Sequence, residues 1–171
     1  MAKDLFIVRH AHAEFSRLGD FFSPLSEIGQ MAAKESAAAL ANYATPPQAI
    51  VCSPAIRALT TAEIFAATWG LDNSIIKTDK RIYDLLYIDK FADVLLEHFP
   101  RQQQIVLIGH NPSMSMLYYS CTTLEGENKV PVAMTPASMV HLHFDDATDW
   151  RWESISKASS YREIYPAIPH G

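Results

Sequence analysis

The sequence has few cysteines and no excess of positive charge. Cys52 and Cys121 are too few for a disulfide framework and lack the paired spacing of a zinc finger. We expect both to be buried free thiols, as in proteins of a reducing compartment. The net charge of −5, without a cluster of basic residues, argues against a surface dedicated to nucleic acid.

Long apolar segments are also missing from the chain. No run approaches the length of a membrane span, and the start, Met-Ala-Lys-Asp, has none of the layout of a secretory signal. We therefore expect a cytoplasmic protein. No internal repeat or low-complexity linker divides the 171 residues, so residues 1–171 are predicted to form a single domain.

Short apolar runs alternate with helical patterns along most of the sequence. The predicted strands are 5–8, 49–52, 74–77 and 105–108, and the predicted helices are 26–43, 54–69, 91–98 and 113–120. Residues 138–144 and 150–154 are expected to form a terminal hairpin, followed by a loosely packed tail over 159–171. This order predicts an α/β fold of three layers with a mostly parallel, mixed central sheet.

Three of these strands end where residues suited to phosphate chemistry begin. The run 5–8 leads into Arg9-His10, the run 49–52 leads through Ser53 to Arg57, and the run 105–108 leads into Gly109-His110. If the strands are parallel neighbours, these residues converge at one edge of the sheet, where open α/β sheets place their ligands.

Arginine and histidine are the residue types that phosphoryl transfer requires. Arg9 and Arg57 offer planar, permanently charged forks for phosphate oxygens. Arg57 falls in the first turn of its predicted helix, where the helix dipole disfavours a cation by roughly 0.3–1 kcal/mol. We therefore expect an anion beside it. A neutral imidazole can attack phosphorus, and a second histidine can donate to a phosphate oxygen, so this scheme needs no cofactor and no metal.

The motifs together resemble those of the histidine phosphatase superfamily. They are residues 5–10, Ser-Pro-Ala-Ile-Arg at 53–57 with Thr-Ala-Glu at 61–63, and Gly-His-Asn-Pro at 109–112. The short chain, the Arg-His-Ala form and Leu-Ser-Glu-Ile-Gly at 25–29 are similar to the SixA-type phosphohistidine phosphatases. The resemblance implies a phosphoglycerate mutase-like fold and a histidine phosphatase-like catalytic domain.

The resemblance also implies roles for individual residues. His10 would be the nucleophile that becomes phosphorylated, and Arg9, Arg57 and His110 would form the phosphate pocket. Asn111 and Ser53 would support that pocket.

The sequence departs from the family pattern at three places. Ala11 stands where the wider superfamily has glycine, and residues 21–23 lack the expected charges. Many members supply a general acid from the middle of the chain, where this sequence reads Arg-Ile-Tyr-Asp-Leu-Leu-Tyr over 81–87. Asp84 is the one obvious carboxylate there, and it is either the acid or a simple loop residue.

Several other residues have two interpretations. Ser53 is a helix cap or a ligand, and His12 lines the pocket or faces solvent. His141 and His143 alternate along one strand, as a metal pair would, but polar residues on a half-exposed strand explain that spacing as well.

The leading hypothesis is a metal-independent phosphatase that works through phosphohistidine at His10, on a phosphorylated histidine of a protein partner. The alternatives are a phosphatase or mutase of a small phosphorylated metabolite, and a phosphate-binding module without turnover. We expect no nucleic-acid or membrane partner, and a monomer.

Overall fold

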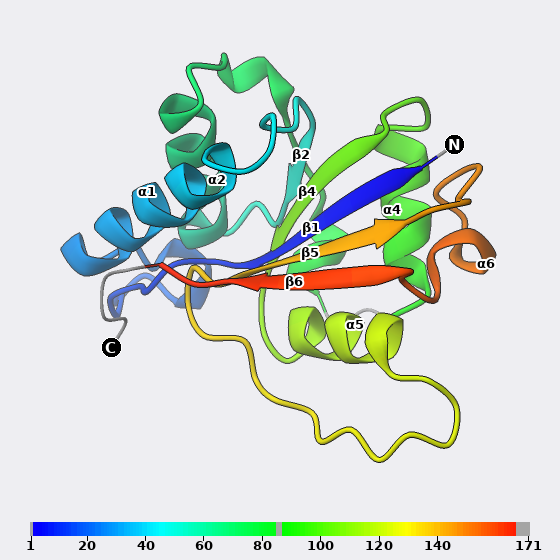
Figure 1. Cartoon of the computed structure of the whole chain (residues 1–171). Helices are drawn as coiled ribbons and strands as arrows, with labels where there is room; N and C mark the ends of the chain where they lie inside the picture. Colours follow the sequence, from blue (N-terminus) through cyan, green and yellow to red (C-terminus); the bar gives the residue numbers. More distant parts are fainter. Residues whose placement is uncertain (1, 85–86, 167–171) are drawn as a thin grey trace.

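The fold is a three-layer α/β/α sandwich built around a six-stranded sheet (Figure 1). We describe residues 2–84 and 87–166 from a computed structural model. The strands are β1 Lys3–Arg9, β2 Ile50–Cys52, β3 Ile76–Thr78, β4 Gln104–Gly109, β5 Met139–Phe144 and β6 Ser160–Ile164. Their order is β3-β2-β4-β1-β5-β6. The first four strands in this order are parallel. Strand β5 runs antiparallel to β1, and β6 runs antiparallel to β5 and so in the same direction as the first four. The prediction of a mostly parallel mixed sheet is confirmed.

Helices cover both faces of the sheet. The α-helices are α1 Glu27–Ala41, α2 Ile56–Thr68, α3 Lys80–Tyr83, α4 Lys90–His98, α5 Ser113–Thr122 and α6 Trp152–Ile155. Two short 3₁₀ helices, η1 Asp20–Phe22 and η2 Asn73–Ile75, lie in the connections. In Figure 1, α1 and α2 lie together on one side of the sheet, and α4, α5 and α6 lie on the other.

The apolar run of β1 explains why the sheet has two cores. Successive side chains of a strand point to opposite faces. Leu5 and Ile7 pack with α4, α5 and α6, whereas Phe6 and Val8 pack with α1 and α2, and all four are fully buried. Residues 5–8 have no polar side chain because both faces of the strand are buried there, so the polar side chains at its carboxyl end are Arg9 and His10.

The two long helices begin differently. Helix α1 starts as predicted, because the Ser26 hydroxyl accepts a hydrogen bond from the Gly29 backbone N–H and caps the helix. Helix α2 begins at Ile56, two residues later than predicted, and Ser53 is not its cap. The Ser53 hydroxyl instead accepts from the Ala55 N–H and closes the turn before the helix. Gly70, with a φ of +70°, ends that helix region as expected.

The predicted terminal hairpin is wrong. Residues 150–154 do not pair with β5, since Trp150 is fully buried and Trp152 begins α6. The partner of β5 is β6, which lies inside the segment expected to be a loose tail. Strand β6 is polar and exposed apart from Ile164, so it has no apolar run to reveal it. Residues 167–171 of that predicted tail lie outside the described part.

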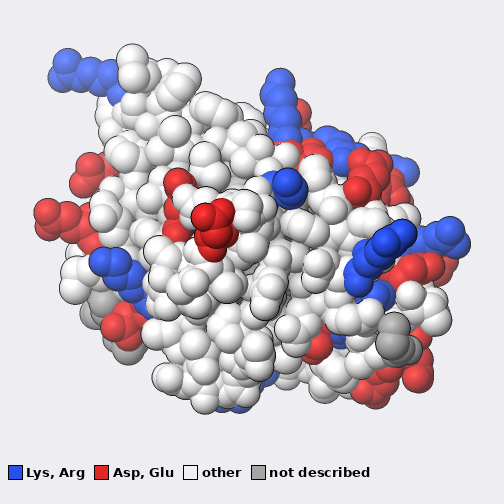
Figure 2. Space-filling view, turned by 90° about the horizontal axis from the view of Figure 1, so that it is seen from above, with Lys and Arg blue, Asp and Glu red and all other residues white. Residues whose placement is uncertain are grey.

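The expectation for the cysteines is confirmed. Both cysteines are free and buried. On the face shown in Figure 2, acidic and basic side chains are interspersed around a broad uncharged area and do not form a single-sign patch. Within the described residues, no helix combines the length and apolar character that a membrane crossing requires.

Candidate active site

The three strand ends lie side by side at one edge of the sheet. Arg9 is in register with Gly109 on β4, and Cys52 on β2 is in register with Ile108. The His10 N–H donates to the Gly109 carbonyl over 3.0 Å, and the Ser53 N–H donates to the Ile108 carbonyl over 3.1 Å. Parallel pairing therefore brings residues that are about a hundred positions apart in the sequence to one place.

His10 is held in a single neutral form. Its Nδ1–H donates to the Ala11 carbonyl over 2.7 Å, and its Nε2 accepts from Arg57 Nε over 3.3 Å. The ring proton is therefore on Nδ1, and the lone pair is on Nε2. Burial, together with the charges of Arg57 and Arg9, lowers the pKa of His10 to about 4. The unprotonated imidazole is the form that can attack phosphorus.

His110 lies beside His10, and its ring proton is on Nε2, whereas that of His10 is on Nδ1. The two ring centroids are 5.1 Å apart, and His110 Nδ1 accepts from Arg57 Nη2 over 3.2 Å. Burial, then the neighbouring His10 and Arg57, lowers the pKa of His110 to about 3, so its remaining proton is on Nε2. His110 Nε2 and Arg9 Nε are both buried and have no hydrogen-bond partner among the described residues. Within the described part of the chain, these two N–H donors are therefore left without an acceptor.

An open pocket of about 420 Å³ lies in front of His10. Of the predicted site residues, it is lined by Arg9, His10, His12 and Arg57. Glu14, Phe15, Asp20, Ser23 and Pro136 contribute to its rim. His110, Ser53, Asn111 and Asp84 do not line it, and His110 is connected to it through Arg57.

Asp20 supplies the anion that the position of Arg57 predicts. Arg57 is the second residue of α2 and is 9% exposed. Its Nη2 donates to Asp20 Oδ2 over 2.9 Å, and its Nη1 donates to the Asp20 carbonyl over 2.6 Å. The hydrogen bond from Arg57 is the main cause that lowers the pKa of Asp20, and the Tyr83 hydroxyl adds a second donor at 3.1 Å. Asp20 was not predicted from the sequence, although the anion expected beside Arg57 was a signal for it.

Thr61 fixes the loop that carries His10. Its hydroxyl accepts from the Ala11 N–H over 3.1 Å and donates to the Arg57 carbonyl over 2.7 Å. Ala137, which has a φ of +63°, adds backbone hydrogen bonds to the Arg9 and His10 carbonyls over 3.0 and 3.2 Å. The loop after β1 is therefore held from both sides.

Asn111 does not line the pocket and contacts a lining residue only through a shared carbonyl. Its side-chain amide donates to the Met134 carbonyl over 2.9 Å, and Arg9 Nη1 donates to the same oxygen over 2.8 Å. Asn111 therefore shares with Arg9 the carbonyl that orients its guanidinium. This arrangement fits a supporting residue rather than a phosphate ligand.

His12 lines the pocket and is linked to the start of α1. His12 Nδ1 and Ser26 Oγ are 2.7 Å apart. The helix can approach this closely because residue 29 is glycine: a Cβ there would lie 2.1 Å from the His12 carbonyl oxygen.

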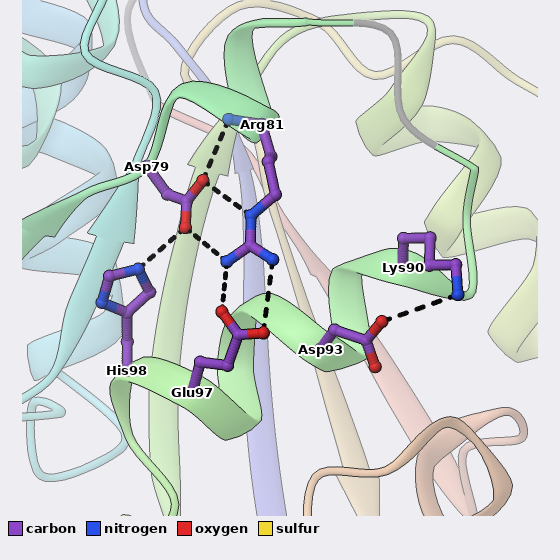
Figure 3. Close-up of polar contacts among 6 residues, drawn as sticks. All are labelled: Asp79, Arg81, Lys90, Asp93, Glu97 and His98. Atoms are coloured by element: carbon purple, nitrogen blue, oxygen red, sulfur yellow. Dashed lines mark hydrogen bonds and ion pairs between the residues drawn. The ribbon is translucent and has the colours of Figure 1, made fainter.

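Asp84 is exposed at the end of α3, next to Tyr83. The Tyr83 ring lies edge-on to His110, with centroids 5.6 Å apart. Figure 3 shows how the start of α3 is anchored: the Asp79 carboxylate accepts from Arg81 and from His98 on α4, and Arg81 also pairs with Glu97. The helix therefore presents Tyr83 to the site. Leu85 and Leu86, which follow Asp84, lie outside the described residues.

Comparison with known proteins agrees with this geometry. The sequence model of the histidine phosphatase superfamily (branch 1) matches residues 5–85, a stretch that contains Arg9, His10 and Arg57. Residues 5–85 are thus similar in sequence to the histidine phosphatase superfamily. A search of curated protein sequences found no significant match.

Solved structures are similar to this chain over nearly its whole length. The protein histidine phosphatase SixA in complex with tungstate is 18% identical, with coverage of 95% of this chain and 97% of that one and a TM-score of 0.75. A SixA described from Nakamurella multipartitia is 17% identical, covers 98% of both chains and has a TM-score of 0.74. A mycobacterial glucosyl-3-phosphoglycerate phosphatase is 20% identical, covers 98% and 100% of the two chains, and has a TM-score of 0.65. At these identities the likeness establishes the fold.

Proposed function

We propose that the chain is a phosphohistidine phosphatase that works through a phosphohistidine intermediate at His10. The similarity of residues 5–85 to the histidine phosphatase superfamily supports a phosphatase hydrolase. The observation that carries the mechanism is the state of His10: its Nδ1–H is bound to the Ala11 carbonyl, and its Nε2 lone pair lies at the phosphate pocket beside Arg57.

The reaction has two displacements at phosphorus. His10 Nε2 forms a bond to phosphorus while the bond to the leaving group breaks, and water then attacks the phosphohistidine to release phosphate and restore the imidazole. The negative charge of the transferring group is met by Arg9 and Arg57, and His110 Nε2–H supplies a neutral donor. The residues of the site provide this charge stabilisation themselves, so the mechanism uses no metal.

A phosphoramidate suits this site because its leaving group needs little help. When the other ring nitrogen of a phosphohistidine is protonated, the leaving group departs as a neutral imidazole. An alkoxide leaving group, by contrast, requires a proton from a general acid. Asp20 is held as a carboxylate by Arg57 and Tyr83, so it is a poor acid in this arrangement.

The rim of the pocket supports a substrate presented on a protein. Phe15 lines the pocket and is 88% exposed, and Leu18 in the same loop is 79% exposed. Apolar side chains at the mouth of a polar pocket favour contact with a protein surface. We therefore propose a protein that carries a phosphorylated histidine as the partner.

The test compares phosphohistidine with p-nitrophenyl phosphate in the presence of a chelator. We expect higher kcat/KM on phosphohistidine, and loss of both activities in His10→Ala. A preference for the ester would overturn the substrate assignment, and turnover retained in His10→Ala would overturn the mechanism. Binding of tungstate without turnover of either compound would identify a phosphate-binding module.

A phosphatase of small phosphorylated metabolites is the second candidate. Two observations favour this candidate: the structural similarity to a glucosyl-3-phosphoglycerate phosphatase, and the carboxylate of Asp84 next to Tyr83. In that case Asp84→Asn would lower kcat on the ester far more than on the phosphoramidate. Equal losses on both substrates would show that Asp84 is not the acid.

A further inference from the structure

A second cluster of titratable side chains lies at the opposite end of β1 from the active site. Asp4 on β1 is in register with His143 on β5, and His141 is two residues earlier on the same strand. Because side chains alternate along a strand, the three groups share one face of the sheet. From Asp4 to Arg9, five residues of strand span roughly 16 Å, so this cluster is separate from the phosphate pocket.

The three side chains converge on one point. Asp4 Oδ1 lies 2.7 Å from His141 Nε2 and 2.7 Å from His143 Nδ1. The three ligand atoms lie within 4.8 Å of one another, and no other group of three such ligands occurs in residues 2–84 and 87–166. We call Asp4, His141 and His143 the Asp4 cluster.

The outer nitrogen of each imidazole is held by an oxygen. His143 Nε2 lies 3.0 Å from Asp145 Oδ1, and His141 Nδ1 lies 3.5 Å from the Tyr43 hydroxyl. The His141 ring is also stacked on Phe6, with centroids 4.3 Å apart. These contacts direct the inner nitrogens toward Asp4. In metal sites, carboxylates and other oxygens orient ligating histidines in the same way.

The surroundings leave room for a cation. The Asp4 side chain is 16% exposed, and Asp4 lines an open pocket of about 410 Å³ with Thr45 and Gln48. Arg162 is paired across the sheet with His141, but its guanidinium is stacked on the Tyr43 ring at 4.3 Å. Arg101 also lines this pocket, so two guanidinium groups stand near the carboxylates of Asp4 and Asp145.

We propose that the Asp4 cluster binds a divalent transition-metal ion, of which Zn²⁺ is the best fit. Two imidazoles and one carboxylate are a ligand set for zinc rather than for magnesium or calcium. Zinc–ligand bonds of about 2.0–2.1 Å place neighbouring ligand atoms roughly 3.3 Å apart. When zinc binds, the 2.7 Å distances from Asp4 Oδ1 to His141 Nε2 and to His143 Nδ1 therefore increase by about half an ångström. Each of these two nitrogens gives up its proton. The fourth position is left for water.

The test is a zinc titration of the full chain in a background that removes the catalytic imidazoles. His10→Ala with His110→Ala prevents zinc from binding at the active site. Zinc affinity is measured by competition with a chromophoric chelator, and thermal melting is followed with and without the metal. We expect one zinc per chain and a higher Tm with zinc.

Variants then assign the zinc to the cluster. His143→Gln should lower the affinity at least tenfold and abolish the rise in Tm, and Asp145→Asn should weaken binding about tenfold. The matched control is His98→Gln, which removes another half-buried histidine paired with a carboxylate, Asp79, at 2.9 Å. Its zinc affinity should be unchanged.

Nitrogen NMR gives a readout that does not depend on variants. Zinc should shift the imidazole ¹⁵N resonances of His141 and His143 and leave those of His98 in place. The proposal is overturned if zinc fails to bind at micromolar concentration, if His143→Gln and His98→Gln bind equally, or if the His141 and His143 resonances do not move.

Discussion

Arg57 Nε donates a hydrogen bond to His10 Nε2 over 3.3 Å. A guanidinium has no acceptor, so this contact requires a lone pair on the nitrogen that is proposed to attack phosphorus. The other nitrogens of the same guanidinium donate to His110 Nδ1 and to Asp20. One arginine therefore sets the tautomers of both histidines and holds a carboxylate that a phosphate group can replace.

Replacement of Asp20 should strengthen the binding of phosphate analogues. Asp20→Asn removes the carboxylate that competes for Arg57. Because exposed ion pairs contribute about 0.2–1 kcal/mol, we expect tungstate to bind up to about fivefold more tightly, as measured by calorimetry. The control is Glu14→Gln, which removes the same charge from the rim. Weaker binding in Asp20→Asn would show that Asp20 orients Arg57 instead of competing for it.

The activity should persist to lower pH than it would if His10 had the pKa of a free imidazole. With a pKa of about 4, His10 stays neutral from pH 7.5 to 5.5, so kcat/KM should be flat there and fall as the pH approaches 4. The rates are corrected for the separately measured ionisation of the substrate. A decline with its midpoint near pH 6.5 would show that His10 titrates as a free imidazole.

The same shift makes the folded state lose stability in acid. The pKa of His10 is lower in the folded than in the unfolded chain, so below about pH 6.5 the unfolded chain binds the proton first. The stabilising contribution is present above that pH and is lost as the pH falls toward 4. Urea unfolding should show a smaller dependence on pH over this range for His10→Ala.

Much of the fold could be predicted from the sequence because its strands are apolar runs and α1 has a local cap. The start of α2 was predicted too early, since the Ser53 hydroxyl closes a turn and does not cap the helix. Strand β6 was not predicted because its side chains are mostly exposed. The strand predicted at 150–154 was wrong because Trp150 belongs to the core and not to a hairpin.

Some residues of the candidate site could also be predicted from the sequence, and others could not. Arg9, His10, Arg57 and His110 stand in motifs at strand ends or a helix start, and parallel pairing brings them together. Asp20 lies in a loop and reaches Arg57 only through tertiary structure. The spacing of His141 and His143 was visible, but their partner Asp4 depends on the register of two strands.

Thr61 should matter for turnover more than for binding. In Thr61→Val the Ala11 N–H loses its acceptor, at a cost of about 1–3 kcal/mol, and the nucleophile loop is less well held. We expect kcat to fall about tenfold with a small change in KM, and Thr61→Ser to restore it. If Thr61→Ser is as impaired as Thr61→Val, the hydroxyl is not what positions the loop.

Gly29 should be required for the contact between α1 and the pocket loop. An added Cβ would meet the His12 carbonyl at 2.1 Å, so Gly29→Ala should lower the free energy of unfolding by about 1–3 kcal/mol. Urea denaturation measures this change. Gly126→Asn is the control, because no atom lies within 4 Å of a Cβ there and asparagine tolerates its φ of +80°. Equal stability of the Gly29→Ala protein and the unaltered chain would contradict the contact.

The most direct test of the mechanism is to trap the phosphoenzyme. The enzyme is mixed with p-nitrophenyl phosphate, quenched in alkali within milliseconds, digested and mapped by mass spectrometry, and ³¹P NMR identifies the phosphorylated nitrogen. The account predicts a phosphoryl group on Nε2 of His10, absent from His10→Ala. A phosphoryl group on another residue, or continued turnover by His10→Ala without any phosphoenzyme, would contradict it.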